Sequence, residues 1–236
     1  MPLEFEETES VRFRPLQCNE CAGDSTLLDF LIRSHAASGP VSGGSPDEIV
    51  EEITARERPL LLEWVESCPH TQWLSTELHK LDEGSEHVVY FGEDKADVVK
   101  LTRVGTYGDW YFVNEGRVFQ RNATPGDYLM RQFMLLHTFG FAAVPMGITA
   151  EGQIVSVQKF VYGSPPSQIE VDEFLLAFGF DPVKRSCWLW KKGVPGDNMD
   201  FWIGDARADN FVKTSGGIVP IDLRMWVLER DQVISI

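Results

Sequence analysis

The sequence predicts an α+β protein in which a helical N-terminal region precedes antiparallel strands. Apolar side chains recur at helical spacing over the first 80 or so residues, whereas from Glu83 onward short β-branched and aromatic runs alternate with glycine turns. The chain has 236 residues, of which 43% are hydrophobic and 11% aromatic. It is therefore globular, with enough apolar surface for one core or two small ones.

Four helical segments are predicted in the N-terminal region, residues 1–80. The first covers residues 24–32 and ends before a linker rich in glycine, serine and proline. The second begins at Pro46, where acidic residues in the early turns suit the helix macrodipole, and a further helical stretch covers residues 60–66. The fourth is expected over residues 71–81. We interpret this region as a helical extension or cap.

Strands dominate the remainder, residues 81–236. Residues 88–91 and 96–101 are β-branched and aromatic and flank a turn, which predicts a hairpin. A long connection with two glycine turns then leads to a predicted helix over residues 127–139. A second hairpin is expected from residues 142–149 and 153–162. The next predicted elements are a helix that contains Ile169, Phe174, Leu175 and Phe178, then a tryptophan-rich segment, 187–192, and a loop, 193–200.

Charge limits the classes of partner. The chain carries 21 basic and 36 acidic residues, a net charge of −15, with a pI near 4.7. Binding to nucleic acid or to anionic membranes is driven by cationic side chains, so neither is expected. The acidic N-terminus lacks the apolar run of a secretory signal, and no stretch approaches the ~18 apolar residues of a membrane helix. A cytoplasmic location is therefore expected.

The cysteines leave one metal site open. Cys18 and Cys21 form a single CxxC pair, and Cys68 with His70 would complete a tetrahedral zinc site. The alternative is that these are reduced thiols in a reducing compartment.

Four polar residues occur in an order that suits phosphoryl transfer from ATP. Lys100 ends the apolar run Val98-Val99 and would pair with the α and β phosphates, whereas Asp205 would orient a hydroxyl nucleophile. Asn210 and Asp222, the latter predicted on a strand, offer the oxygen ligands that Mg²⁺ prefers. Each residue has an ordinary structural explanation when taken alone, but their order in the chain predicts a phosphotransferase.

The same residues resemble the protein-kinase-like superfamily, which includes protein kinases and aminoglycoside phosphotransferases. Its catalytic loop is Asp-x4-Asn, matched by Asp205 and Asn210, and its metal-binding Asp follows on the next hairpin, matched by Asp222. The segment from Leu81 to Asp222 is most similar to the compact kinase-like domain of bacterial and phage polyvalent proteins. This similarity lies in the runs Glu83-Gly84-Ser85-Glu86-His87-Val88-Val89-Tyr90, Val99-Lys100-Leu101-Thr102, Gly105-Thr106-Tyr107-Gly108, Thr124-Pro125-Gly126-Asp127-Tyr128-Leu129-Met130-Arg131 and Asp205-Ala206-Arg207-Ala208-Asp209-Asn210.

The resemblance implies a two-lobed fold, with a small antiparallel-sheet N-lobe over about 81–161 and a reduced C-lobe over about 162–236. It also implies ATP and Mg²⁺ as cofactors and an unidentified protein or small molecule as acceptor. Arg207 falls where protein kinases place a lysine that touches the γ-phosphate. The implied catalytic residues are Asp205, Lys100 and Arg207; the nucleotide would be held by Gly84, Ser85, Lys100, Gln158, Phe160 and Val161, and the metal by Asn210 and Asp222.

Several departures from the family pattern keep other functions open. Gly84 is the single glycine of the phosphate loop, Asp127 is the one carboxylate in the helix where the family has a glutamate, and Gly204 precedes Asp205 without the usual His or Arg. Only 14 residues follow Asp222, too few for the substrate platform of a protein kinase. The alternatives are a pseudokinase or nucleotide-binding interaction module without transfer activity, and transfer of AMP by an inverted nucleotide.

Overall fold

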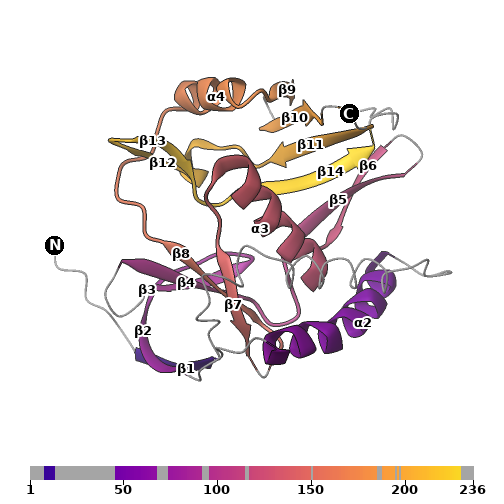
Figure 1. The fold of residues 1–236 in the computed structure, drawn as a ribbon, viewed down its shortest axis with the longest axis vertical. Helices are drawn as coiled ribbons and strands as arrows, with labels where there is room; N and C mark the ends of the chain where they lie inside the picture. The colour runs from indigo at the N-terminus through magenta and orange to yellow at the C-terminus, as the bar shows by residue number, and fades with distance from the viewer. Residues whose placement is uncertain are drawn as a thin grey trace. The chain divides into compact units, whose positions relative to one another are not determined.

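The computed structural model describes residues 8–13, 46–67, 74–91, 96–114, 117–149, 151–184, 188–194, 196 and 198–229. The α+β class is confirmed, because these residues contain three α-helices and several antiparallel sheets (Figure 1). The chain divides into two compact units, which we describe separately. The first unit comprises residues 1–108, 122–129 and 143–160, and the second comprises residues 109–121, 130–142 and 161–236.

A six-stranded antiparallel sheet forms the framework of the first unit (Figure 1). Its strands, in spatial order, are β1 (Thr8–Phe13), β2 (Leu74–Glu83), β3 (His87–Phe91), β4 (Asp97–Thr102), β8 (Ile154–Lys159) and β7 (Val144–Ile148). Both predicted hairpins, β3–β4 and β7–β8, are confirmed. Alternating apolar residues of four strands bury one face of the sheet, as the two-residue period of a strand requires. This core consists of Leu78, Tyr90, Val99, Leu101 and Val155.

The helix predicted over residues 71–81 is wrong, because β2 occupies this segment. Leu74, Leu78 and Leu81 recur at helical spacing, which is what the prediction followed. Pairing with β1 on one side and with β3 on the other overrides that local pattern. The N-terminal region therefore contributes strands to the sheet as well as a helix.

Helix α2 (Pro46–Ser67) begins at the predicted proline but continues through Pro59. Separate helical stretches on either side of Pro59 were expected, since an internal proline removes a backbone hydrogen bond. Val50, Glu57 and Leu61 are buried on one side of the helix, and this packing holds it together across the proline. The predicted helix 24–32, its linker, and Cys18, Cys21, Cys68 and His70 of the zinc alternative lie outside the described residues.

The second unit contains a four-stranded antiparallel sheet and two hairpins (Figure 1). Helix α4 (Gln168–Ala177) and most of α3 (Pro125–Phe139) also belong to it, and both helices confirm their predictions. The sheet has the order β14 (Arg224–Glu229), β11 (Met199–Gly204), β10 (Leu189–Gly193) and β9 (Asp181–Lys184); the hairpins are β12 (Phe211–Thr214) with β13 (Gly217–Pro220) and β5 (Asp109–Asn114) with β6 (Arg117–Asn122).

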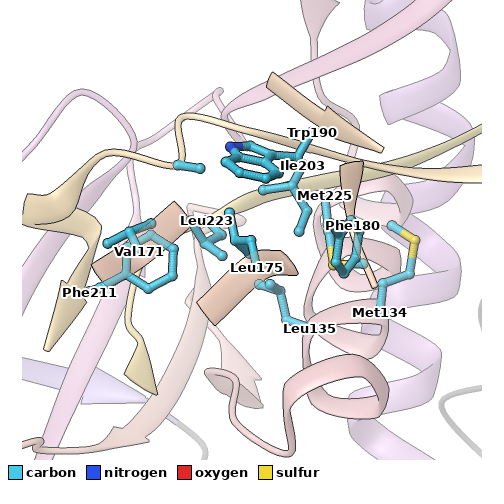
Figure 2. Packing of buried hydrophobic residues seen from close by; sticks show 11 residues of the cluster. Met134, Leu135, Val171, Leu175, Phe180, Trp190, Ile203, Phe211, Leu223 and Met225 are labelled. Carbon is cyan, nitrogen blue, oxygen red and sulfur yellow. The ribbon is translucent and has the colours of Figure 1, made fainter. Parts of the chain in front are cut away.

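Apolar side chains from both helices and from the four-stranded sheet meet in the core of this unit. Figure 2 shows Val171 and Leu175 of α4 beside Phe211 and Leu223, with Trp190 and Ile203 from the sheet close by. The cluster comprises Met134, Leu135, Val171, Leu175, Phe180, Trp190, Ile203, Ala206, Phe211, Leu223 and Met225. It includes Ala206, Phe211 and Leu223, which directly follow the predicted site residues Asp205, Asn210 and Asp222, so this core determines where those segments run.

The hairpin β5–β6 was not predicted, because its residues were interpreted as part of a long connection. Trp110 and Tyr111 begin an aromatic and β-branched run that is typical of a strand. Tyr111 stacks on Trp226 of β14 with ring centroids 4.5 Å apart, which places β5 against the sheet face opposite the main core.

Among the described residues, no helix combines the length and apolar content that crossing a membrane requires.

Candidate functional site

The predicted site residues fall into two groups, one in each unit. The first unit holds most of the residues expected to bind the nucleotide, and the second holds those expected to bind metal and perform chemistry. Gly84, Ser85, Lys100, Gln158 and Phe160 belong to the first unit, and Val161, Asp205, Arg207, Asn210 and Asp222 belong to the second.

Lys100 and Gln158 lie on the same face of the six-stranded sheet. Lys100 of β4 pairs with Ser156 of β8, and Val98 pairs with Gln158. Successive residues of a strand point to opposite faces, so these four lie on the face opposite the core residues Val99, Leu101 and Val155. Lys100 is half-buried and Gln158 is buried. The structure therefore brings these two predicted nucleotide-binding residues to adjacent positions.

Gly84 and Ser85 form the turn between β2 and β3. The Gly84 amide donates to the His87 carbonyl at 2.9 Å, and Arg103 Nε donates to the Gly84 carbonyl at 2.8 Å. Both turn residues are exposed, and a Cβ added at Gly84 would contact only the His87 carbonyl, 4.0 Å away. The turn is therefore a fixed, open stretch of backbone next to the strand that pairs with β4.

Three side chains that the sequence interpretation missed form a buried hydrogen-bond chain on the face of Lys100. The Tyr128 hydroxyl lies 3.2 Å from His87 Nε2 and 3.0 Å from Ser156 Oγ. Ser156 Oγ in turn donates to the carbonyl of Lys100 at 3.4 Å. Since Tyr128 belongs to the first turns of α3, the chain ties that end of the helix to the backbone of β4.

Asp127 caps helix α3. Its carboxylate accepts a hydrogen bond from the Thr124 amide at 2.9 Å, and the Thr124 hydroxyl accepts one from the Asp127 amide at 3.2 Å. This reciprocal pair is a capping box, which satisfies amides that the helix start leaves free.

Phe160 follows β8, where its amide donates to the Ala96 carbonyl and its ring packs on Phe91, with ring centroids 5.2 Å apart.

In the second unit, Asp205, Asn210 and Asp222 are linked by hydrogen bonds. Asn210 Nδ2 donates to the Asp205 carbonyl at 2.7 Å. The Asn210 carbonyl accepts from the amides of Ile221, at 2.9 Å, and of Asp222, at 3.4 Å. Asp222 does not lie on a strand as predicted, because it occupies the bend between β13 and β14. The structure thus brings together three residues that the sequence could only order.

Each of these three residues is followed directly by a buried apolar residue. Ala206 and Phe211 follow Asp205 and Asn210, and Leu223 follows Asp222; all three side chains are at most 3% exposed. Burial of the following side chain fixes the backbone while the polar side chain stays at least partly accessible. Gly204 is required before Asp205 for a steric reason, since a Cβ there would lie 2.9 Å from the Trp226 ring.

The backbone is strained at two connected positions. Asp205 has φ 57° and Trp188 has φ 48°, in the left-handed region that side chains other than glycine rarely adopt. The Ala206 amide donates to the Trp188 carbonyl at 3.3 Å, so the two residues are coupled. Such strain persists only where the surroundings impose it, and it is concentrated at functional sites.

Two arginines accompany Asp205. Arg207 is exposed and hydrogen-bonds the Asp209 carboxylate, which with the charge of Asp205 raises the pKa of Arg207. Arg224, which the sequence interpretation missed, pairs with Asp109 at 2.6 Å. Burial lowers the pKa of Arg224, but its contact with Tyr111 and the charges of Asp109 and Asp205 raise it overall. Both arginines therefore stay charged close to Asp205.

The resemblance implies that Asn210 and Asp222 would hold Mg²⁺, and both side chains are at least partly accessible. Because Asn210 Nδ2 is bonded to Asp205, a cation would contact the amide through Oδ1, and Asp222 adds an exposed carboxylate. Among the described residues, no three His, Cys, Asp or Glu side chains are grouped to enclose a metal. Mg²⁺ suits such an open site, since it is commonly held by one or two carboxylates together with substrate phosphates and water.

Comparison with known protein families, with curated proteins and with solved structures finds no match for this chain.

Proposed function

We propose that the protein is an ATP-dependent phosphotransferase, an atypical kinase that moves the γ-phosphoryl group to a hydroxyl of a protein or small molecule. The observation that carries the proposal is the hydrogen-bonded set of Asp205, Asn210 and Asp222 in the second unit. Phosphoryl transfer requires a group that orients the attacking oxygen and oxygen ligands for a metal, at fixed relative positions. A cytoplasmic location, where ATP and Mg²⁺ are abundant, goes with this proposal.

In this proposal Asp205 orients the attacking hydroxyl and accepts its proton. Asn210 Oδ1 and the Asp222 carboxylate hold Mg²⁺, which when bound neutralises charge on the phosphates. Arg207 and Arg224 stabilise negative charge near Asp205, Arg207 at the surface and Arg224 within the pair that it forms with Asp109. The strained conformation of Asp205 is consistent with a functional constraint at this position.

The first unit supports the nucleotide-binding part of the proposal. Lys100 and Gln158 share a sheet face, and the exposed Ser85 offers its hydroxyl to phosphate oxygens, whereas the Gly84 amide already donates to the His87 carbonyl. Gln158, Phe160 and Val161 are the candidates for contacts with adenine, which sits in apolar surroundings with few polar groups.

A nucleotide-binding module without transfer activity is the second candidate, and the role of Asp127 favours it. The resemblance to kinases implies a helix carboxylate that pairs with the lysine, yet the carboxylate of Asp127 accepts from Thr124 in the capping box of α3. A carboxylate committed to a cap is less available to position Lys100. Binding without turnover would identify this class.

The test is magnesium-dependent binding of ATP, measured from the melting temperature. At a ligand concentration roughly 100 times Kd, binding stabilises the folded state by about 2.7 kcal/mol. We expect ATP with Mg²⁺ to raise the melting temperature more than ATP with EDTA. Asp222→Asn should abolish the magnesium-dependent part of this rise in melting temperature. Asp181→Asn, at an exposed position of β9, should keep it. No shift with either ATP or GTP in the presence of Mg²⁺ would refute both candidates.

A further inference from the structure

Gln168 occupies a fixed position at the first residue of α4. Ser167 is the N-cap, and it forms a capping box with Glu170. Val171 and Leu175 are fully buried in the core of the second unit, which anchors the helix (Figure 2). A side chain at this position therefore starts from a well-defined backbone.

The amide of Gln168 bridges two backbone groups of the segment 205–210. Gln168 Nε2 donates to the Ala206 carbonyl at 2.9 Å, and Gln168 Oε1 accepts from the Ala208 amide at 3.1 Å. Nε2 also donates to Asp172 Oδ1 at 3.1 Å. A carbonyl can only accept and an amide N–H can only donate, so these contacts fix which end of the Gln168 amide is which.

The bridge supports the segment 205–210 from an element outside it. Asn210 connects Asp205 to the bend at Asp222, whereas Gln168 holds the backbone on both sides of Arg207 from a separate helix. With φ 57° at Asp205, the backbone would relax toward a commoner conformation if it were not held. Gln168 thus adds support from a separate helix to that of the Asn210 side chain and of the bond between the Ala206 amide and the Trp188 carbonyl.

We propose that Gln168 is a positioning residue, which holds the segment 205–210 so that Asp205 and Asn210 keep the geometry that phosphoryl transfer requires. The inference rests on the proposed function for its catalytic part. Its structural part, the amide bridge, can be measured without any activity. The two parts therefore call for separate measurements on the same variants.

The first measurement is hydrogen exchange of single backbone amides by NMR in the full-length protein. Gln168→Leu removes both bonds, so we expect the Ala208 amide to exchange at least tenfold faster. Gln168→Glu keeps an acceptor for Ala208 but sets a carboxylate oxygen against the Ala206 carbonyl and Asp172, so the Ala208 amide should exchange faster than in wild type and more slowly than in Gln168→Leu. The Val194 amide, which donates to the Met199 carbonyl outside the segment, is the internal reference. Unchanged exchange at Ala208 in Gln168→Leu would overturn the proposal.

The second measurement separates positioning from folding. Both Gln168 variants lose the donor to Ala206, and we expect each to lower kcat at least tenfold with the Kd for MgATP within twofold of wild type. Glu173→Gln, at an exposed position of α4, is the matched control and should match wild type. Full kcat in both Gln168 variants would overturn the catalytic part. Faster exchange at Ala208 together with an inactive wild type would uphold the bridge and refute the phosphotransferase proposal.

Discussion

Asp205 combines an unfavourable backbone conformation with a polar side chain. The left-handed φ of 57° is unfavourable for a side chain, and the neighbouring Gly204 and Ala206 are held by packing against Trp226 and the core. A glycine would adopt this conformation without strain, and aspartate is one of the few other residues that tolerate it.

This trade-off predicts the effect of Asp205→Gly on stability. Relief of strain should offset the higher chain entropy of glycine in the unfolded state, a term of about 0.5–1 kcal/mol. Asp181→Gly is the matched control, because Asp181 is exposed on β9 and has no positive φ. We expect Asp205→Gly to lower the free energy of unfolding in urea less than Asp181→Gly does. The reverse order would show that Asp205 is not strained.

Glu170 predicts a pH dependence of stability. Its hydrogen bonds with Lys213 and with the amide and hydroxyl of Ser167 lower its pKa from 4.5 to about 2. A carboxyl whose pKa is lowered on folding stabilises above its unfolded pKa, and this contribution is lost as the pH falls from 4.5 toward 2. The difference in unfolding free energy between wild type and Glu170→Gln should therefore shrink over this range. A difference that stays constant with pH would contradict the assigned contacts.

Among the elements, the contact between α2 and the start of α3 defines the role of the N-terminal region. The buried Glu57 accepts a hydrogen bond from the Gly126 amide at 2.7 Å, which satisfies a free N–H and places negative charge at a helix N-terminus. Burial raises the pKa of Tyr107, and the charge of Glu57 adds to this while Arg58 opposes it. Helix α2 is thus an integral part of the first unit.

The contact predicts a non-additive pair of substitutions. A Cβ at Gly126 would lie 2.7 Å from Glu57 Oε1, so Gly126→Ala should lower the free energy of unfolding by about 1–3 kcal/mol. Glu57→Ala leaves the buried Gly126 amide without this partner, a loss of about 1–3 kcal/mol. In the double variant the steric clash is absent. Its loss of unfolding free energy should therefore be smaller than the sum of the losses in the two single variants. Strict additivity in urea denaturation would indicate that the residues do not touch.

The elements that the sequence predicted are those in which local pattern and tertiary pairing agree. The β-branched runs of β3 and β4 and the apolar period of α3 are examples. Prediction failed where tertiary contacts decide: β2 has helical spacing but pairs with two strands, and α2 continues through Pro59 because buried side chains hold it on both sides. Such pairing cannot be deduced from a local window.

For the whole molecule, the sequence indicated candidate site residues, which stay a prediction, but not the contacts that support them. The spacing of Asp205 and Asn210 indicated a catalytic loop, and both residues are joined by a hydrogen bond. Nothing in the sequence indicated that Gln168, 38 residues before Ala206, would reach that loop, or that Arg224 would pair with Asp109. These contacts depend on how α4 and β5 pack, and packing is not encoded in a motif.

The net charge of −15 opposes the approach of ATP to the molecule. Binding would therefore depend on Mg²⁺ and on local cations, of which Lys100 in the first unit and Arg207 and Arg224 in the second are the candidates. The central claim is that these groups serve transfer of the γ-phosphoryl group, rather than nucleotide binding alone or transfer of AMP.

The most direct test follows the nucleotide itself by ³¹P NMR, with purified protein, ATP and Mg²⁺, and with water or the protein's own hydroxyls as acceptor. We predict that wild type and Asp181→Asn convert ATP to ADP, and that Asp205→Asn slows this conversion at least a hundredfold, which corresponds to about 2.7 kcal/mol in the barrier. Formation of AMP, or ATP that remains unchanged in wild type as in Asp205→Asn, would contradict the account.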